Sequence, residues 1–342
     1  MRRFRVVIAG GGVAALEAAL ALRRLAEERV SVELVAPEPR FWYRPLAVVE
    51  PFGRGSLHGL DLAKLADECG ALFVVDELAA VEVDAHVARA ASGAAFDYDA
   101  LLVATGARPV AAVPGAATFR GPADVEAYSG VLAELRAGSL RRIVFVVPDG
   151  ATWPLPLYEL ALQTASAVPD AELTLVTPET DPLDVFGSAA STALAELLEQ
   201  RGIALLTRTS YEEGAVPTDA VIALPRLVPT PIDGLPHDAD GFVPTDPHGR
   251  VRGADDVFAA GDVVAFPVKQ GGIAAQQADA AAEAIAAAAG APIEPEPFRP
   301  ILRGLLLSGE EPILWRPGKI AGRYLTPFLA ERAETILSAV GS

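Results

Sequence analysis

Residues 5–22 read RVVIAGGGVAALEAALAL, a short apolar run that meets three glycines and then a helical pattern. In the motif Gly10-x-Gly12-x-x-Ala15, Gly10 permits a tight turn, and Gly12 lets backbone amides approach a pyrophosphate at the positive end of the following helix. The small Ala15 allows the helix to pack closely against the strand. The stretch therefore predicts a strand at 4–9, a phosphate-binding turn and a helix at 13–27. A glycine-rich turn in an ordinary α/β fold is the alternative.

The same stretch is also similar to a secretory signal, because basic residues precede an apolar run and small residues follow. Glu17 interrupts that run, however, and the glycines lie where a turn is needed. We therefore prefer the strand and the helix. Residues 31–36 add a second strand, so the chain is expected to open with a β–α–β unit.

Composition limits the classes of function. The chain has 342 residues, of which 51% are hydrophobic, and this is enough for a sizeable core divided over two domains. Its net charge of −17 works against binding nucleic acid or an anionic membrane through bulk charge. The single cysteine, Cys69, forbids an intrachain disulfide, which favours a cytoplasmic location. The four histidines are scattered, so no metal site is expected.

A second β–α–β pattern begins at residue 143. We expect strands at 143–147, 172–177 and 204–207, and helices at 157–167 and 189–201. A proline-dense passage at 226–249 then leads back to the first unit. The pattern predicts an α/β fold with a discontinuous first domain at 1–110 and 225–295, an inserted Rossmann-like domain at 111–224, and a C-terminal interface segment at 296–342.

Two later motifs indicate which dinucleotide the first domain binds. Residues 100–109, ALLVATGARP, contain Thr105 and Gly106, and residues 253–264, GADDVFAAGDVV, contain Gly261 and Asp262. Together with the first glycine motif, they resemble the FAD-dependent pyridine nucleotide-disulfide oxidoreductase superfamily, in the branch of sulfide:quinone oxidoreductases, flavocytochrome sulfide dehydrogenases and type II NADH dehydrogenases. The resemblance implies a glutathione-reductase-like fold with two dinucleotide-binding domains. It also implies that FAD is the cofactor and that Asp262 binds the ribityl chain.

The segment after Asp262 adds positive charge. A helix that begins at Gly271 or Gly272 would point unpaired amides and a positive dipole end at the pyrimidine side of a flavin. That field would stabilise the negative charge of the reduced ring. Lys269 is one of three lysines and would add a full charge there as an anchor for a hydride acceptor or a substrate anion. A surface lysine in a loop is the alternative.

Two positions near the expected FAD leave alternatives open. The second strand ends in Ala36 and Pro37, where the resemblance implies an acidic ribose ligand. Glu38 takes this role if the turn bends back, and is otherwise a solvated acid. Arg44, in the sequence FWYRP, contacts FAD or substrate, or else faces solvent.

The chain departs from these relatives in its cysteines. Disulfide reductases of the superfamily carry a cysteine pair beside the flavin, and sulfide:quinone oxidoreductases hold sulfur on cysteines. Cys69 alone can do neither, and we interpret it as a buried structural thiol. In the NADH dehydrogenase branch a glutamine stands where this chain has Gly272, which weakens the case for a quinone. The tail favours core packing or a homodimer contact over peripheral membrane contact.

The inserted domain lacks a second phosphate cradle. Residues 153–160 read WPLPLYEL, so that Thr152, Pro154 and Leu157 fill the glycine positions. The next strand ends in Thr177 rather than in an acid. An ordinary NAD(P)H site is therefore not expected, unless residues 149–152 form a different cradle.

Two interpretations of this stretch remain. In the functional one it forms a rigid wall over the flavin, where Trp153 or Tyr158 stacks on a planar substrate and Glu159 handles a proton. In the other, Trp153 is a core residue at the domain interface, Pro156 is the first helical residue and Glu159 is a charge on the helix face.

These motifs together predict an FAD-dependent oxidoreductase without cysteine chemistry. It would pass a hydride or electrons through the flavin to a quinone or another small molecule, with NAD(P)H an open question as donor. The alternative is an FAD-binding signalling or assembly protein whose catalysis has lapsed. A serine hydrolase built on Ser56 and His58 is disfavoured, because GRGSLHG lacks the pattern Gly-x-Ser-x-Gly.

Overall fold

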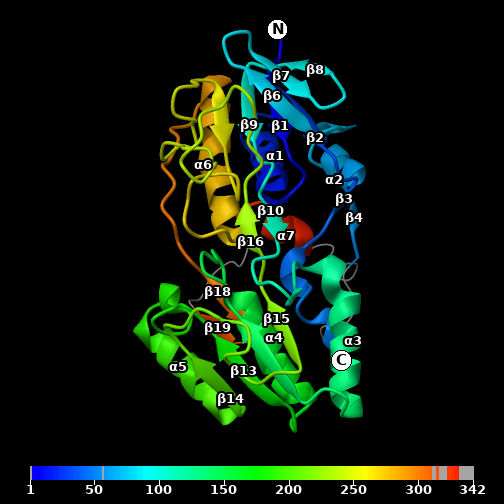
Figure 1. Ribbon diagram of the computed structural model, residues 1–342. Helices are drawn as coiled ribbons and strands as arrows, with labels where there is room; N and C mark the ends of the chain where they lie inside the picture. Colours follow the sequence, from blue (N-terminus) through cyan, green and yellow to red (C-terminus); the bar gives the residue numbers. More distant parts are fainter. Residues whose placement is uncertain (1, 56–57, 310–312, 316–321, 331–342) are drawn as a thin grey trace.

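The computed structural model describes residues 2–55, 58–309, 313–315 and 322–330. Within these ranges the chain forms two five-stranded sheets of parallel strands, which lie one above the other in Figure 1. The predicted α/β class is therefore confirmed. Part of the C-terminal segment predicted at 296–342 lies outside the described residues.

The first sheet has the strand order β17-β9-β1-β2-β5. Its strands are β1 (Phe4–Ala9), β2 (Val30–Ala36), β5 (Ala71–Val75), β9 (Ala100–Val103) and β17 (Val257–Ala259). Because successive side chains of a strand point to opposite faces, Val6 and Ile8 pack against helices while Val7 and Ala9 pack against other strands. β17 comes from late in the chain, so two distant segments build this sheet.

Helices cover one face of the first sheet and a small β-meander covers the other. The helices are α1 (Val13–Ala26), α2 (Leu62–Glu68) and α6 (Gly271–Ala288), and α1 and α6 lie side by side (Figure 1). The meander consists of β6 (Leu78–Glu82), β7 (Val87–Ala90) and β8 (Ala95–Asp97). Burial on both faces explains why β1 and β9 read as continuous apolar runs.

The second sheet has the order β11-β15-β12-β13-β14. Its strands are β11 (Ala117–Thr118), β12 (Arg142–Val146), β13 (Glu172–Val176), β14 (Ile203–Leu206) and β15 (Ala220–Ala223). One face packs against α3 (Val125–Ala137), α4 (Leu155–Ala167) and α5 (Ser188–Gln200). The sequence pattern did not predict α3, which follows the prolines after residue 108.

A two-stranded ribbon of β10 (Arg108–Val110) and β16 (Arg226–Val228) lies between the two sheets (Figure 1). The predicted domain boundaries near residues 110 and 225 fall on this ribbon, and the division into domains remains our interpretation. Shorter elements complete the described chain: β3 (Arg40–Phe41), β4 (Leu60–Asp61), β18 (Gly304–Leu306), β19 (Ile313–Trp315), α7 (Leu325–Ala330) and the 3₁₀ turns η1 (Arg44–Leu46), η2 (Glu50–Phe52), η3 (Pro122–Asp124) and η4 (Asp184–Phe186).

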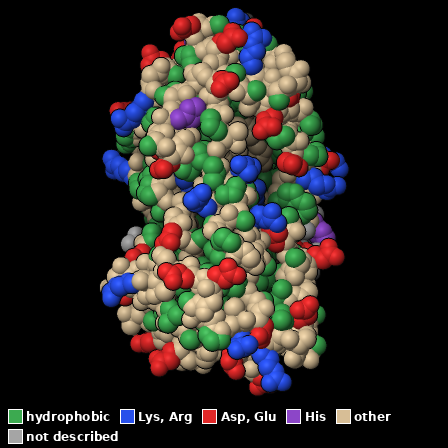
Figure 2. Space-filling view, in the orientation of Figure 1, with side chains coloured by type: hydrophobic (Ala, Val, Ile, Leu, Met, Phe, Trp, Pro, Cys, Tyr) green, Lys and Arg blue, Asp and Glu red, His purple; other side chains and the backbone are tan. Residues whose placement is uncertain are grey.

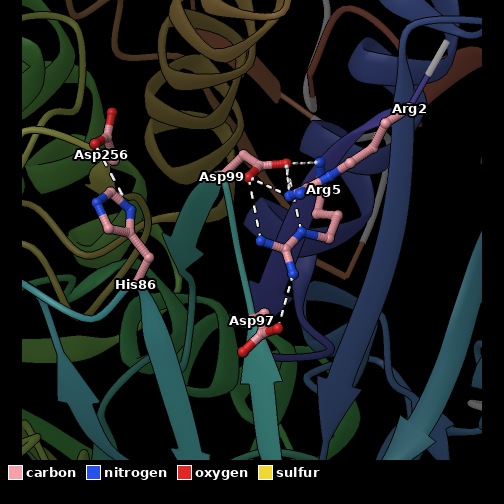
Figure 3. A network of polar contacts seen from close by, with 6 residues as sticks. All are labelled: Arg2, Arg5, His86, Asp97, Asp99 and Asp256. Atoms are coloured by element: carbon pink, nitrogen blue, oxygen red, sulfur yellow. Dashed lines mark hydrogen bonds and ion pairs between the residues drawn. The ribbon is translucent and has the colours of Figure 1, made fainter.

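A network of polar and charged side chains lies at the amino-terminal ends of strands of the first sheet (Figure 3). The Arg5 guanidinium donates to Asp97 at 3.0 Å and to Asp99 at 3.2 Å, so the start of β1 is tied to the turn after β8. His86 Nδ1 lies 3.8 Å from an oxygen of Asp256, just before β17. Strands rise about 3.3 Å per residue, so this network lies a full strand length from the glycine turn that follows β1.

No helix in the described part of the chain combines the length and the apolar run that crossing a bilayer requires. On the face drawn in Figure 2, acidic side chains occur over both halves of the molecule, and several basic ones lie near the waist between them.

Candidate functional site

The predicted cofactor motifs meet at the carboxyl edge of the first sheet. Backbone hydrogen bonds join the ends of its strands: Gly10 N donates to Val35 O at 2.8 Å, Ala104 N to Ala9 O at 2.7 Å, and Ala260 N to Val103 O at 3.0 Å. The glycine turn, Thr105-Gly106 and Gly261-Asp262 follow these strand ends directly. This edge of a parallel sheet is where α/β folds bind ligands.

The glycine turn has the geometry of a phosphate cradle. Gly10 has φ of 131°, and a Cβ atom there would lie 2.1 Å from the carbonyl oxygen of Ala104, so only glycine fits. A Cβ atom on Gly12 would meet no atom within 4 Å. Gly12 is also the residue before α1, and no side chain caps that helix end. Open space in front of uncapped amides fits a pyrophosphate.

The two helices that begin at this edge are held together by small residues. Ala15 is fully buried, and a Cβ atom on Gly261 would lie 3.2 Å from the Cβ of Ala14. Gln277 of α6 accepts a hydrogen bond from Gly261 N at 2.9 Å through its buried side chain. Gln277 therefore fixes the turn that carries Asp262, a role that the sequence motif did not reveal.

Asp262 is half-buried and interacts electrostatically with two cations. Burial raises the pKa of its carboxyl group, and the charges of Lys269 and Arg44 oppose that rise. Arg44 begins the turn η1 and is otherwise exposed. The structure thus brings together three residues that the sequence placed near a flavin: Arg44, Asp262 and Lys269.

Lys269 is buried, with 6% of its surface exposed. Its Nζ donates to the carbonyl oxygen of Val264 and lies 3.7 Å from the centroid of the Phe242 ring, a cation–π arrangement. Burial lowers the pKa of Lys269 to about 8, against the opposing charges of Asp262 and Asp238. A surface lysine in a loop, the alternative considered above, does not describe this side chain.

The start of α6 differs in one respect from the expectation. Gly271 and Gly272 are its first two residues, as predicted, but Gln270 caps the helix by accepting from Ile273 N at 3.0 Å. One amide of the first turn is therefore already satisfied within the chain. The amides of the two glycines are the ones left to face a ligand.

The other predicted cofactor residues lie at the surface of the same edge. Glu38 is exposed in the turn after β2, and Thr105 is exposed after β9. Gly106 is half-buried with φ of 75°, a conformation that favours glycine. Contact of these three residues with FAD stays a prediction.

The loop between β12 and α4 is filled with packed side chains. Trp153 is half-buried and meets the ring of Phe186 edge-on, with centroids 5.7 Å apart. Pro154 precedes the helix, and Pro156 is its second residue rather than its first. The structure thus places Trp153 in a packing contact.

Glu179, the acidic residue nearest the end of β13, accepts hydrogen bonds from three groups of the chain. Glu179 accepts from the Tyr158 hydroxyl at 2.7 Å, from the Thr177 hydroxyl at 2.8 Å and from Leu183 N at 3.1 Å. Tyr158 is itself fully buried, with a pKa raised by burial and by Glu179. Three donors of the chain therefore already occupy the carboxyl group of Glu179.

Glu159 is buried in α4 with 5% of its surface exposed, so it is not a charge on a solvated helix face. Its Oε1 accepts from Leu307 N at 3.0 Å, and burial raises its pKa to about 8. One turn later, Gln163 donates to the carbonyl oxygen of Val48 at 3.0 Å. α4 is therefore joined to the segment that begins with Arg44 and to β18.

Other expected features concern cysteine and metals. Cys69 is buried and forms no disulfide. Among the described residues, no three His, Cys, Asp or Glu side chains are grouped in a way that could hold a metal ion.

Comparisons with known proteins agree with this geometry. The NADH dehydrogenase-like protein of Mycobacterium tuberculosis (strain CDC 1551 / Oshkosh) is 28% identical over 306 residues, covering 76% of this chain and 73% of that protein. The structure of sulfide:quinone oxidoreductase from Aquifex aeolicus superposes with a TM-score of 0.84 at 20% identity, covering 98% of this chain and 91% of that one. NDH2 of Plasmodium falciparum in complex with NADH gives a TM-score of 0.71 at 14% identity, covering 98% and 95%.

A family model described as "Pyridine nucleotide-disulphide oxidoreductase" matches residues 4–228, from β1 to β16. The family binds FAD and uses pyridine nucleotides. With the glycine cradle of β1 and the discontinuous first sheet, this match is decisive: the chain belongs to the pyridine nucleotide-disulphide oxidoreductase family and is an oxidoreductase.

Proposed function

We propose that the protein binds FAD at the carboxyl edge of the first sheet and passes a hydride or electrons through it to a quinone or another small acceptor. The observation that carries the proposal is the convergence of the Gly12 cradle, Asp262 and Lys269 at one edge. We also propose the domain division given above and a cytoplasmic location. We propose further that the C-terminal segment forms a homodimer contact.

The residues have separate tasks. FAD supplies hydride and electron transfer when bound. The amides after Gly12 would hold its pyrophosphate, and the Asp262 carboxylate would accept hydrogen bonds from its ribityl hydroxyls. Lys269 and the first amides of α6 would stabilise negative charge on the reduced ring, because both are positive and Lys269 is shielded from water.

Glu159 is proposed as the residue that handles a proton. Its raised pKa, about 8, keeps its carboxyl group protonated at neutral pH, as a general acid requires. The hydrogen bond from Leu307 N fixes one oxygen, so the proton resides on the other. Tyr158 has no place in this proposal, because its hydroxyl is buried against Glu179.

Observations on the electron donor point in two directions. The mycobacterial relative is named an NADH dehydrogenase-like protein, which favours NADH. The hydrogen bonds that Glu179 accepts within the chain and the packed Trp153 oppose a conventional NAD(P)H cradle. The quinone acceptor is supported by the fold shared with a sulfide:quinone oxidoreductase.

The test is the visible spectrum of the purified protein under anaerobic conditions. NADH and then NADPH are added, and a soluble quinone follows. Loss of the flavin band with either nucleotide and its return with quinone would support the proposed redox function and overturn the argument against a nicotinamide site. A flavin band that no nucleotide bleaches, but that quinone restores after chemical reduction, would support the proposal with another donor. Reduced flavin that quinone leaves unchanged would favour the alternative of lapsed catalysis.

A pair of variants tests whether Asp262 contributes to FAD binding. Asp262→Asn is expected to lower the molar ratio of flavin to protein. The matched change Asp255→Asn lies on an exposed residue before β17, at the opposite edge of the sheet, and should leave the ratio unchanged. Equal flavin content in both variants would refute the assigned role of Asp262.

A further inference from the structure

A glutamate in the middle of the first helix holds the distant C-terminal segment. Glu17 of α1 has no exposed surface. Its Oε1 accepts from Tyr324 N at 2.7 Å and its Oε2 from Leu325 N at 2.6 Å, so both oxygens bind the start of α7. A Cβ atom on Gly322 would lie 2.1 Å from this carboxyl group, so a glycine is needed for the close approach.

A second carboxyl group lies beside the first. Asp279 of α6 is a hydrogen-bond neighbour of Glu17, and burial followed by the charge of Glu17 raises its pKa to about 8. Its Oδ1 is buried and has no hydrogen-bond partner in the described part of the chain. Because Glu17 uses both oxygens as acceptors for amides, the proton of the pair belongs on Asp279, which donates to Glu17.

Other charged groups lie around the pair, and Glu296, Arg299 and Arg303 line the same cavity as Asp279. Glu283, also on α6, adds negative charge, and Arg323 adds positive charge from the segment before α7. Arg323 donates to Glu283 at 3.1 Å, but its side chain is 56% exposed. The solvated guanidinium of Arg323 therefore offsets little of the repulsion between the carboxylates of Glu17 and Asp279.

The rest of the α7 contact is apolar and does not titrate. Leu325 is fully buried and Leu329 is 8% exposed, within the core that α1 and α6 share, and Phe328 packs partly against it. This packing alone would favour docking at any pH. The carboxyl pair is the part of the contact that responds to protons.

We propose that Glu17 and Asp279 form a proton-operated latch that docks α7 onto α1 and α6. With one proton on the pair, Asp279 donates to Glu17 and Glu17 holds the two amides of α7. Loss of that proton leaves two adjacent carboxylates, the fully buried Glu17 and the half-buried Asp279. Moving α7 away then lets water reach Glu17. The latch is independent of the proposed redox function.

The direction with pH follows from linkage. The docked state binds the Asp279 proton more tightly than an exposed carboxyl group does. Docking is therefore strongest below the ordinary carboxyl pKa and weakens as pH rises to about 8. A single proton changes the docking equilibrium by at most about tenfold per pH unit within that window.

Hydrogen exchange of the Tyr324 and Leu325 amides tests the latch, because these amides are the groups that Glu17 binds. Protection is corrected for the intrinsic rate at each pH and referred to amides of α5, which is remote from the pair. Wild-type protection should fall at least tenfold between pH 6 and pH 8. Asp279→Asn should keep α7 docked and make protection independent of pH, since the amide group donates to Glu17 without titrating.

Two further variants complete the design. Glu17→Gln should lower protection at every pH, because only one side-chain oxygen remains to accept. Asp67→Asn, the same change on an exposed residue of α2, should behave as wild type. The proposal is overturned if wild-type protection is the same at pH 6 and pH 8, if Asp279→Asn retains the fall, or if Glu17→Gln protects the amides as wild type does.

Discussion

Replacing Glu159 by glutamine removes its ability to ionise but keeps its hydrogen bond. The glutamine oxygen still accepts from Leu307 N, while the group can no longer ionise. An ordinary glutamate has a pKa of 4.5, and Glu159 has one of about 8, a difference worth about 5 kcal/mol. Because the folded-state pKa is raised, the stabilisation present below pH 4.5 is lost progressively as pH rises through 8. Glu159→Gln should thus exceed wild type by less than about 1 kcal/mol at pH 5 and by several kcal/mol at pH 9.

Urea unfolding followed by circular dichroism from pH 5 to pH 9 measures this difference. An infrared band of a protonated carboxyl group, present in wild type at pH 6 and absent from Glu159→Gln, gives an independent readout. Glu126→Gln, an exposed change on α3, is the matched control and should track wild type. If the free energies of unfolding of wild type and Glu159→Gln differ by the same amount at pH 5 and pH 9, Glu159 does not titrate as argued.

Four other substitutions test the site and its surroundings. Gly10→Ala should destabilise the fold by roughly 3 kcal/mol or more, because the added Cβ has no room. Gly12→Ala should fold normally and lose flavin. Thermal unfolding and the flavin content of each variant measure both effects. Tyr158→Phe should cost about 1–3 kcal/mol in urea unfolding, since Glu179 loses a donor. Lys269→Met should raise stability at pH 7 by up to about 3 kcal/mol, because a buried lysine with a pKa of about 8 carries its charge at a cost, and this gain should shrink as pH rises from 8 to 10.5.

Local patterns in the sequence predicted most of the fold. The helix expected at 13–27 is α1 (Val13–Ala26), and the strands expected at 4–9 and 31–36 are β1 (Phe4–Ala9) and β2 (Val30–Ala36). Glycine turns and buried apolar runs are local signals and need no knowledge of distant contacts. α3 was missed because its apolar residues Tyr128, Leu132 and Leu135 follow closely after prolines that read as a loop.

The sequence predicted a residue of the site only where the backbone geometry requires that residue type. Gly10 and Gly261 are required by positive φ and by close contacts, and the motif records this. The roles of Gln277 and Glu17 depend on partners 16 and 307 residues away, which no local pattern encodes. Polar residues within Ala-rich apolar helices were the only available signal, because a buried polar side chain needs a partner.

The β12–α4 loop explains how a nucleotide-binding frame can persist without its glycines. A phosphate cradle contributes little to folding, since the strand and the helix are stabilised by burial, as Phe145 and Leu160 are here. Side chains can therefore fill the cradle, provided that they satisfy their own polar groups. Trp153 packs on Phe186, and the Tyr158 hydroxyl donates to Glu179, so filling this space leaves no buried donor unpaired at Tyr158. Gly10 of the first sheet cannot be replaced in this way, because its Cβ would lie 2.1 Å from the carbonyl oxygen of Ala104, directly after β9.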